Sequence, residues 1–371
     1  MKIIVMHVPA GSGHEKAAEA VADAIRYRQP EAETLLMNGL EGMSSTYQWA
    51  FTQGYLNMIH KYPALWGAAY HLLDQRNLAW AAYKIHRSSN ASHGKVLEGI
   101  LLRHKPDLFI ATHFFPAEVA AYLKQQGQLK AKLITVITDY MPHNVWISPG
   151  TDAYVVGMEL TKQELVFRGV PEEKIHVLGI PTDPKFSLKG DRRALAGPLK
   201  IDPELFTVLV VSGGFGTGPM EGLVQSLRSI PEPIQVLAVA GKNTQLRERL
   251  EALRPAFPHK LHVYGFVDNM YELMDLSDLM VTKSGGLNCT EAMMKGLPMV
   301  LVAPIPGQET RNARIIEKVG AAVLAGPVEN TRAVVWELKG NQARRQEMSR
   351  RGASACRPNS AAEIARMALS L

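Results

Sequence analysis

The stretch Lys2–His14, KIIVMHVPAGSGH, decides the fold of the first half of the chain. A short apolar run passes directly into two glycines and a histidine, which is the pattern of a buried strand, a tight turn and the start of a helix. The stretch Thr207–Gly214, TVLVVSGG, repeats the run and the glycine turn. The repetition predicts two units, each of which begins with a strand, a glycine turn and a helix.

More short apolar runs rich in β-branched residues alternate with stretches of helical composition. They cover residues 107–112, 133–138, 234–239, 279–282 and 298–302. Such alternation indicates βαβ units and parallel sheets. The length of 371 residues favours two domains, because a single core stops growing near about 250–300 residues. We therefore expect an α/β protein with two Rossmann-like domains.

The pattern also suggests where the domains begin and end. We place an N-terminal domain at residues 1–187, a linker at 188–203 and a C-terminal domain at 204–350. Residues 351–371 have helix-forming composition with apolar residues at three-to-four spacing, so we expect a terminal helix that can cross back to the first domain. An insertion at about 42–95 interrupts the alternation and is rich in Trp, Tyr and Met.

Charge and cysteine content limit the classes of partner and compartment. The formal net charge of +6 permits attraction to nucleic acid, anionic lipid headgroups or nucleotide diphosphates. We expect no nucleic-acid partner, because no basic motif has the interleaved aromatic residues of an RNA- or DNA-binding module. Cys289 and Cys356 are too few for a disulfide framework, which favours a reducing compartment. The apolar run Lys2–Val8 is too short for a signal peptide or a spanning helix.

The glycine turns are candidate ligand loops. Glycines let the backbone approach a ligand, and a helix N-terminus offers unpaired N–H groups, so Gly11-Ser12-Gly13 can hold an anion. A plain tight turn is the alternative. His14 favours a ligand role, because open α/β sheets bind ligands at this edge and a neutral imidazole can act as a general base. The second loop, Gly213–Gly218, has neither the Walker nor the dinucleotide fingerprint, so we expect neither a kinase nor a dehydrogenase.

Residues 280–313 contain the groups that a nucleotide sugar requires. Gly285 and Gly286 follow a strand and open a helix, whose N-terminus suits a diphosphate. Glu291 lies on the first turns of that helix, where its carboxylate can reach a ribose diol. Gln308 and Glu309 lie after the next strand, and an amide beside a carboxylate can hydrogen-bond several sugar hydroxyls.

Polar residues also follow strands of the first half. Asp139 follows the strand at 133–138, where a carboxylate can orient His14 or help to remove a proton. A helix N-cap is the alternative role for Asp139. His113 follows the strand at 107–112, and we rank it below His14 because edge histidines are often only solvated.

The insertion gathers aromatic side chains, among them Trp49, Tyr55 and Trp66. Interfacial membrane helices have this composition. A core packed under a lid is the alternative. Basic residues of the same half, such as Lys95 and Arg103, suit anionic lipid headgroups or form a solvated face.

Eight motifs occur in order along the chain. They are Gly11–His14, Thr138–Tyr140 with His143 and Trp146, Gly179–Pro181, Ser212–Gly214, Gly265–Val267, Lys283–Gly286, Glu291 and Pro306–Glu309. With these motifs the sequence resembles, over nearly its whole length, the glycosyltransferase family of monogalactosyldiacylglycerol synthases and bacterial processive diacylglycerol glucosyltransferases, within glycosyltransferase family 28. It is more distantly similar to the peptidoglycan N-acetylglucosaminyltransferase.

The resemblance implies the GT-B architecture, in which two Rossmann-like domains face a central cleft. It also implies an acceptor bound by the N-terminal half, a donor bound by the C-terminal half, and inversion at the anomeric carbon. His14 takes the place of the catalytic histidine, and the match favours a role for Asp139 beside it. The expected acceptor or membrane residues are His113, His143, Trp146, Trp49, Tyr55 and Trp66.

The resemblance also assigns the donor site. Backbone groups of Phe266 and Val267 would meet uracil, Gly286 the diphosphate and Glu291 the ribose, while Gln308 and Glu309 would meet the sugar. The full expected set is Gly213, Gly214, Phe266, Val267, Ser284, Gly285, Gly286, Glu291, Gln308, Glu309 and Asn312. Two features depart from the family pattern: Ser284 stands where many relatives have proline, and the loop after Val211 varies among relatives. Neither departure removes a proposed polar contact.

We therefore expect an inverting enzyme that transfers a hexose from UDP-glucose or UDP-galactose to 1,2-diacylglycerol, with glucose favoured. The resemblance places it as a peripheral protein on the cytoplasmic face of the cell membrane, with anionic lipids as partners and without a metal or other cofactor. Two alternatives stay open. They are transfer of N-acetylglucosamine to a polyprenyl-linked acceptor and epimerisation of a UDP-sugar by a soluble enzyme of the same fold.

Overall fold

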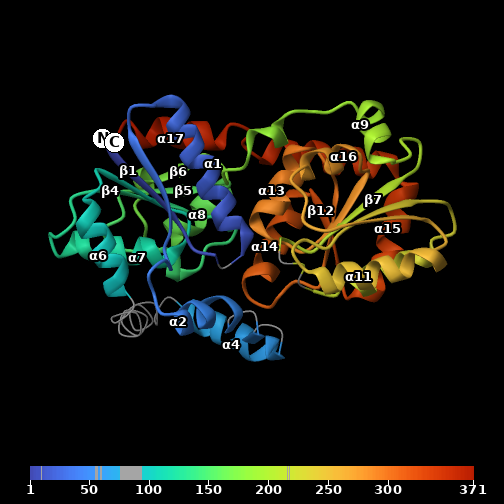
Figure 1. Cartoon of the computed structure of the whole chain (residues 1–371), viewed down its shortest axis with the longest axis horizontal. Helices are drawn as coiled ribbons and strands as arrows, with labels where there is room; N and C mark the ends of the chain where they lie inside the picture. The colour runs from blue at the N-terminus through green and yellow to red at the C-terminus, as the bar shows by residue number, and fades with distance from the viewer. Residues whose placement is uncertain (10, 55–56, 59–60, 76–93, 215, 217) are drawn as a thin grey trace. The chain divides into compact units, whose positions relative to one another are not determined.

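The computed structural model describes residues 1–9, 11–54, 57–58, 61–75, 94–214, 216 and 218–371. The chain forms two compact units (Figure 1). The first contains Met1–Asp183, Ile305–Gln308 and Asn359–Leu371, and the second contains Pro184–Pro304 and Glu309–Pro358. Each unit has a parallel sheet with helices on it, which confirms the expected α/β class with two Rossmann-like halves.

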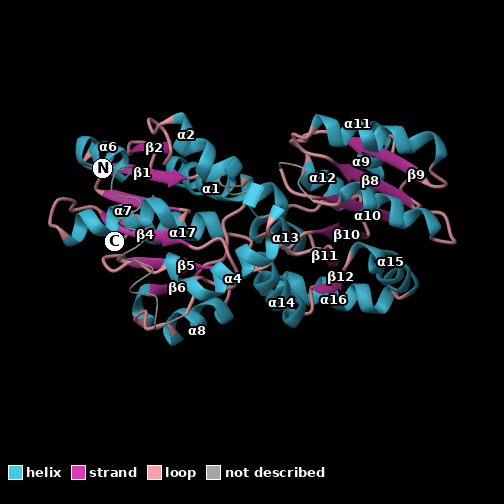
Figure 2. Ribbon diagram, turned by 90° about the horizontal axis from the view of Figure 1, so that it is seen from below, coloured by secondary structure: helices cyan, strands magenta, loops and turns pink. Residues whose placement is uncertain are grey.

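The first unit is built on a parallel sheet of six strands in the order β2-β1-β3-β4-β5-β6, which lie side by side in Figure 2. The strands are β1 (Lys2–His7), β2 (Glu33–Asn38), β3 (Leu108–Ala111), β4 (Lys132–Val136), β5 (Ala153–Val156) and β6 (Ile175–Val177). Because the strands are parallel, the residues that follow them meet at one edge of the sheet.

Helices cover both faces of this sheet. The helical elements are α1 (Ser12–Arg28), α2 (Ser45–Trp49), the π-helical turn η1 (Ala50–Gly54), α4 (Pro63–Leu73), α6 (Gly94–His104), α7 (Phe114–Gln125), η3 (Asn144–Trp146), α8 (Glu159–Phe167), η4 (Glu172–Lys174) and α17 (Ser360–Ala368). Apolar residues of α1 and α17 pack with alternate residues of β1 on one face. Those of α6 and α7 pack with the intervening residues on the other face. The helix expected at the C-terminus is α17, which lies against α1 (Figure 1).

The second unit has a parallel sheet of six strands in the order β12-β11-β10-β7-β8-β9. Its strands are β7 (Thr207–Val211), β8 (Gln235–Val239), β9 (Lys260–Tyr264), β10 (Leu279–Thr282), β11 (Met299–Val302) and β12 (Ala322–Gly326). Its helical elements are η5 (Pro184–Ser187), α9 (Arg192–Leu199), α10 (Met220–Ser226), η6 (Leu227–Ser229), α11 (Thr244–Leu253), η7 (Arg254–Ala256), α12 (Met270–Asp275), α13 (Gly286–Met294), α14 (Gln308–Val319), η8 (Val328–Asn330), α15 (Thr331–Gly340) and α16 (Gln342–Ala355). The first residue of α14, Gln308, groups with the first unit.

The strands predicted from the sequence are confirmed as β1, β3, β4, β7, β8, β10 and β11. The stretch 188–203, expected as a linker, contains α9 and groups with the second unit. Arg192 of this stretch binds Asp278 through two nitrogens, at 2.8 and 3.0 Å. This paired contact fixes α9 beside the start of β10.

In the part of the chain that the structure describes, no helix combines the length and the apolar character needed to cross a membrane.

Candidate active site

His14 lies in the first turn of α1, at the carboxyl edge of the first sheet. Gly11 precedes the helix with φ of 119°, a conformation that glycine adopts without strain, so the chain can turn sharply from β1 into α1. The His14 Nδ1 atom lies 2.8 Å from the Thr112 carbonyl oxygen and 3.0 Å from Thr138 Oγ1. The Thr112 hydroxyl donates in turn to the His14 carbonyl at 2.8 Å. Residues that follow β3 and β4 thus hold the imidazole and its backbone.

These contacts determine which nitrogen of His14 can accept a proton. A carbonyl oxygen only accepts hydrogen bonds, so Nδ1 carries the hydrogen that it donates to Thr112, and the lone pair is on Nε2. Burial lowers the pKa of His14 below its usual value, although the charge of Asp139 and the Thr112 carbonyl oppose the shift. His14 is therefore neutral at pH 7 and suited to act as a base.

Asp139 follows β4 and is 5% exposed. Its Oδ2 accepts a hydrogen bond from Trp146 Nε1 at 3.2 Å, and its Oδ1 accepts one from Gln308 Nε2 at 2.5 Å. No α-helix starts after Asp139, so the alternative role as a helix N-cap is wrong. The carboxylate is instead held by two side-chain donors and acts electrostatically on His14.

Two other expected histidines cap helices. His113 Nδ1 accepts the Phe115 N–H at 3.1 Å and begins α7, while its ring lies 4.8 Å from the ring of His14. His143 Nδ1 accepts the Val145 N–H at 3.1 Å and begins η3. Both side chains are buried. The caps explain their position at the ends of strands, and the rings of His113 and Trp146 enclose His14.

The aromatic insertion divides into a packed part and an exposed part. Tyr47 and Phe51 pack against the core of the first unit, and the Phe51 ring lies 5.7 Å from that of Phe115. Trp66 is partly buried and lies 6.2 Å from Tyr70. The exposed apolar side chains are Trp49 (56%), Met58 (40%), Tyr62 (60%), Leu65 (59%) and Leu72 (53%). The expected residue Tyr55 lies outside the described residues.

The second unit brings glycine loops together at the carboxyl edge of its sheet. The loop after β7 contains Gly213 and Gly214, and it packs on the loop after β8, where Lys242 N–H donates to the Gly214 carbonyl at 3.0 Å. A Cβ on Gly216 would lie 2.1 Å from the Ala240 carbonyl oxygen, and one on Gly241 would lie 2.5 Å from that of Gly214. Only glycines allow the two loops to approach so closely.

The loop after β9 presents Phe266 and Val267 at the same edge. Phe266 is 49% exposed, and Lys242 Nζ lies 5.4 Å above its ring. Val267 is partly buried. An exposed ring with a cation beside it offers a surface on which a planar base can stack.

Residues after β10 and β11 complete this edge. Gly285 precedes α13, whose first turn has no side-chain cap, so backbone N–H groups remain for a ligand. Ser284 Oγ donates to the Glu309 carbonyl at 2.6 Å, and the Glu309 carboxylate lies 3.4 Å from Lys283 Nζ. The remaining expected donor residues are Gly286, the first residue of α13, and two buried residues, Glu291 on α13 and Asn312 on α14.

The donor residues expected from the sequence therefore gather at one sheet edge, with one exception. Gln308 groups with the first unit and binds Asp139, whereas its neighbour Glu309 belongs to the second unit. Among the described residues, no cluster of histidine, cysteine and carboxylate side chains could hold a metal ion.

Several residues of the site were not predicted from the sequence. Thr112 could have been found, since it is the last residue of the run predicted as a strand at 107–112. Lys283 is the first residue of the motif Lys283–Gly286, and Lys242 comes directly after a glycine in the loop that follows β8. Asp74 and Arg168, which form an ion pair near the Asp139 loop, are far apart in the chain, so no local pattern connects them.

Two parallel α/β units, one with a partly buried neutral histidine and one with glycine loops at the sheet edge, have the GT-B architecture, which many glycosyltransferases share. Residues 14–182 match the family model of monogalactosyldiacylglycerol (MGDG) synthase, and residues 207–355 match that of the glycosyltransferase family 28 C-terminal domain. The chain belongs to this family of glycosyltransferases, which includes the processive diacylglycerol β-glucosyltransferases. Those of Bacillus cereus strain AH187 and Bacillus thuringiensis strain Al Hakam are 30% identical to it over 329 residues, covering 87% of this chain and 81% of theirs.

Solved structures share the fold at lower identity. MurG from Acinetobacter baumannii has a TM-score of 0.64 and 17% identity over the whole of both chains. The UDP-GlcNAc 2-epimerase from Neisseria meningitidis, bound to UDP-GlcNAc, has a TM-score of 0.63 and 14% identity over the whole of both chains. Transferase and epimerase have the same architecture, so the fold alone does not distinguish these activities.

Proposed function

We propose that the protein transfers a hexose from a UDP-sugar to the hydroxyl of 1,2-diacylglycerol, with inversion at the anomeric carbon. The observation that supports this reaction is the tautomer of His14. Its Nδ1–H donates a hydrogen bond to the Thr112 carbonyl, which leaves the lone pair on Nε2. The lipid acceptor is supported by the names of relatives that are 30% identical over most of their length. Glucose is the favoured sugar for the same reason.

In this scheme His14 Nε2 takes the proton of the acceptor hydroxyl. The hydroxyl oxygen then attacks the anomeric carbon of the donor, and the bond to the diphosphate breaks with its electron pair on UDP. Asp139 stabilises the imidazolium that forms, because its charge already raises the pKa of His14.

The second unit supplies the leaving-group site. The free N–H groups at the start of α13 and the positive end of its dipole stabilise the negative diphosphate. Phe266 offers a face for uracil, and Glu291 is the proposed partner of the ribose. This arrangement requires no metal ion, so we propose a reaction that proceeds without one.

The acceptor is insoluble in water, so the enzyme has to meet a membrane. We propose that exposed side chains of the insertion, led by Trp49, Tyr62 and Leu65, contact the lipid surface on the cytoplasmic face. A formal net charge of +6 supports attraction to anionic headgroups. The protein would then be a peripheral membrane enzyme.

The test is transfer from radiolabelled UDP-glucose and UDP-galactose, in parallel, to diacylglycerol in anionic liposomes. UDP-N-acetylglucosamine is the control donor, and products are separated by thin-layer chromatography. Labelled glycolipid from UDP-glucose is the expected result. If protein that binds UDP gives no product from any donor, the proposed acceptor is wrong. Conversion of a UDP-sugar to its epimer would identify the alternative activity instead.

A further inference from the structure

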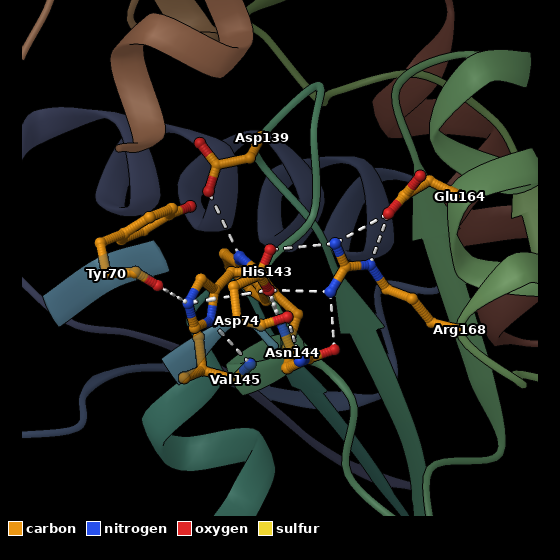
Figure 3. A network of polar contacts seen from close by, with 9 residues as sticks. Tyr70, Asp74, Asp139, His143, Asn144, Val145, Glu164 and Arg168 are labelled. Atoms are coloured by element: carbon orange, nitrogen blue, oxygen red, sulfur yellow. Dashed lines mark hydrogen bonds and ion pairs between the residues drawn. The ribbon is translucent and has the colours of Figure 1, made fainter. Parts of the chain in front are cut away.

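The C-terminal end of α4 is fixed by a buried ion pair (Figure 3). Asp74 caps this helix, and its side chain is 8% exposed. Arg168, the residue directly after α8, donates two hydrogen bonds to the carboxylate. Nη1 donates to Oδ1 at 2.8 Å, and Nη2 donates to Oδ2 at 3.0 Å. A paired contact of this kind restricts orientation as well as distance.

Every N–H group of the Arg168 guanidinium has a partner. Nε donates to Glu164 Oε1 at 2.8 Å, and Nη2 lies 2.7 Å from the same oxygen. Nη1 also donates to Asn144 Oδ1 at 2.6 Å. With the two bonds to Asp74, the five donors of the guanidinium are occupied. Arg168 therefore has no donor left for a phosphate or lipid headgroup, and its contacts are all within the protein.

Asn144 and His143 connect this pair to the loop that carries Asp139. The Asn144 N–H donates to Asp74 Oδ1, and Asn144 Nδ2 donates to the Asp74 carbonyl, both at 2.8 Å. His143 Nε2 donates to the Tyr70 carbonyl at 3.0 Å. Trp146, two residues after Asn144, donates a hydrogen bond to Asp139. The end of α4 is thus tied to the short segment that sets the Asp139 carboxylate.

The face of α4 that carries Tyr70 and Asp74 also touches the segment Ile305–Gln308, which belongs to the same unit. A Cβ on Gly67 would lie 2.8 Å from Pro306 Cβ, and one on Gly307 would lie 2.8 Å from Tyr70 Cγ. Contact this close leaves no space for the helix to shift toward the segment. The next residue, Gln308, donates to Asp139. A shift of α4 would therefore disturb the contacts of Asp139 with Trp146 and Gln308.

We propose that Asp74 and Arg168, with Asn144 between them, form a latch that positions Asp139 and Gln308 for sugar transfer. Arg168 and Asp74 are positioning residues, because they act through α4 and the Asp139 loop and do not touch substrate. The inference rests on the proposed function, since it assigns these residues a role in that same reaction.

The variants Arg168→Ala and Asp74→Asn test the latch. Each is expected to lower kcat for diacylglycerol by about 10- to 100-fold, because a displacement of about 1 Å in a positioned group can cost that much. The Kd for UDP, measured by calorimetry, should stay unchanged because the donor residues of the second unit are intact. The double variant should be no worse than either single variant, since both break the same pair.

Lys124→Met provides a matched control. Lys124 forms an ion pair with Asp152, which precedes β5 and so lies at the amino edge of the same sheet, opposite to Asp139. This variant should lower Tm by a similar amount and leave kcat unchanged. A loss of Tm in the latch variants with kcat equal to that of Lys124→Met would overturn the inference.

Conservative variants keep the test valid if the others do not fold. Arg168→Lys retains the charge but cannot span Asp74, Asn144 and Glu164 together, so it should fold and still lose kcat. Full activity of Arg168→Lys would contradict the latch. Lack of transfer to diacylglycerol by the unmodified protein would instead contradict the proposed function.

Discussion

His14 acquires its chemical character from groups distant in sequence. The Thr112 carbonyl selects the tautomer, burial favours the neutral form, and Asp139 favours the charged form. A base must be neutral before it reacts and must be stabilised once it has taken the proton. Burial keeps His14 neutral before the reaction, and the Asp139 carboxylate stabilises it after it has taken the proton.

Replacement of this base should separate chemistry from binding. His14→Ala should lower kcat for transfer by about 10²- to 10⁴-fold, the usual contribution of a general base. UDP binding should persist because the donor residues belong to the second unit. Initial rates and calorimetry with UDP measure the two effects. His176→Ala, on the edge strand β6, is the control and should retain full activity. Retained turnover in His14→Ala would remove His14 from the mechanism.

The pH dependence should reveal the environment of the same residue. Its pKa is lowered from the usual 6.5, chiefly by burial, so the acidic fall of kcat/KM should lie below pH 6.5. Asp139 raises this pKa, so Asp139→Asn should move the fall to still lower pH while reducing the maximal rate. Profiles of kcat/KM from pH 4.5 to 8, about the range where a histidine titrates, measure both. An unchanged acidic limb in Asp139→Asn would contradict the electrostatic link.

At the scale of single elements, the start of α13 is the clearest candidate for the diphosphate site. Gly285 has an ordinary φ of −67°, and a Cβ added there meets no described atom within 4 Å. Alanine is therefore compatible with the fold at this position. Its methyl group would nevertheless extend into the space beside the helix N-terminus where the phosphates are proposed to bind.

Gly285→Ala should weaken UDP binding by about tenfold, which corresponds to about 1.4 kcal/mol. Its Tm should equal or exceed that of the unmodified protein, since alanine reduces the entropy of the unfolded chain. Gly197→Ala, in α9, is the matched control because its Cβ also meets no described atom within 4 Å. Calorimetry with UDP should show full affinity for this control. Equal affinity in both variants would place the diphosphate elsewhere.

The strands show which elements could be predicted from the sequence. The runs that were predicted lie in the interior of the two sheets, where both faces are covered and most residues are apolar and buried. Four of the strands that were missed, β2, β6, β9 and β12, are the outermost strands of their sheets. β2, β6 and β9 carry polar residues, as in KLHVY of β9, and so are not continuous apolar runs, whereas β12 is apolar but ends in a glycine. The fifth missed strand, β5, is interior and its residues AYVV are buried, so its position in the sheet does not explain why it was missed.

The residues of the candidate site also divide into those that the sequence could locate and those that it could not. Glycine turns and the residues that directly follow predicted strands could be located, because parallel strands end at one edge. Contacts that depend on tertiary packing could not be predicted from the sequence. Arg168 and Asp74 are 94 positions apart, and Gln308 and Asp139 are 169 apart, so no local spacing reveals either pair.

For the whole molecule, the aromatic insertion combines two roles that its composition could not separate. Tyr47 and Phe51 pack against the core of the first unit, whereas Trp49 and Leu65 are more than half exposed. Exposed apolar side chains on neighbouring helices are costly in water and suit a partner that is itself apolar. A lipid acceptor and a net charge of +6 make an anionic membrane the proposed partner.

Trp49→Ser combined with Leu65→Ser should reduce binding to phosphatidylglycerol-containing liposomes by about tenfold, since the loss of two partly inserted apolar side chains exceeds about 1.4 kcal/mol. Sedimentation with liposomes measures the bound fraction. Tyr27→Ser is the matched control: Tyr27 is 90% exposed, but it lies near the end of α1, at the amino edge of the sheet. Raised salt should weaken the binding of all variants, because headgroup attraction is screened. Unfolding of the double variant, or equal binding by it and the control, would show that these side chains do not contact the membrane.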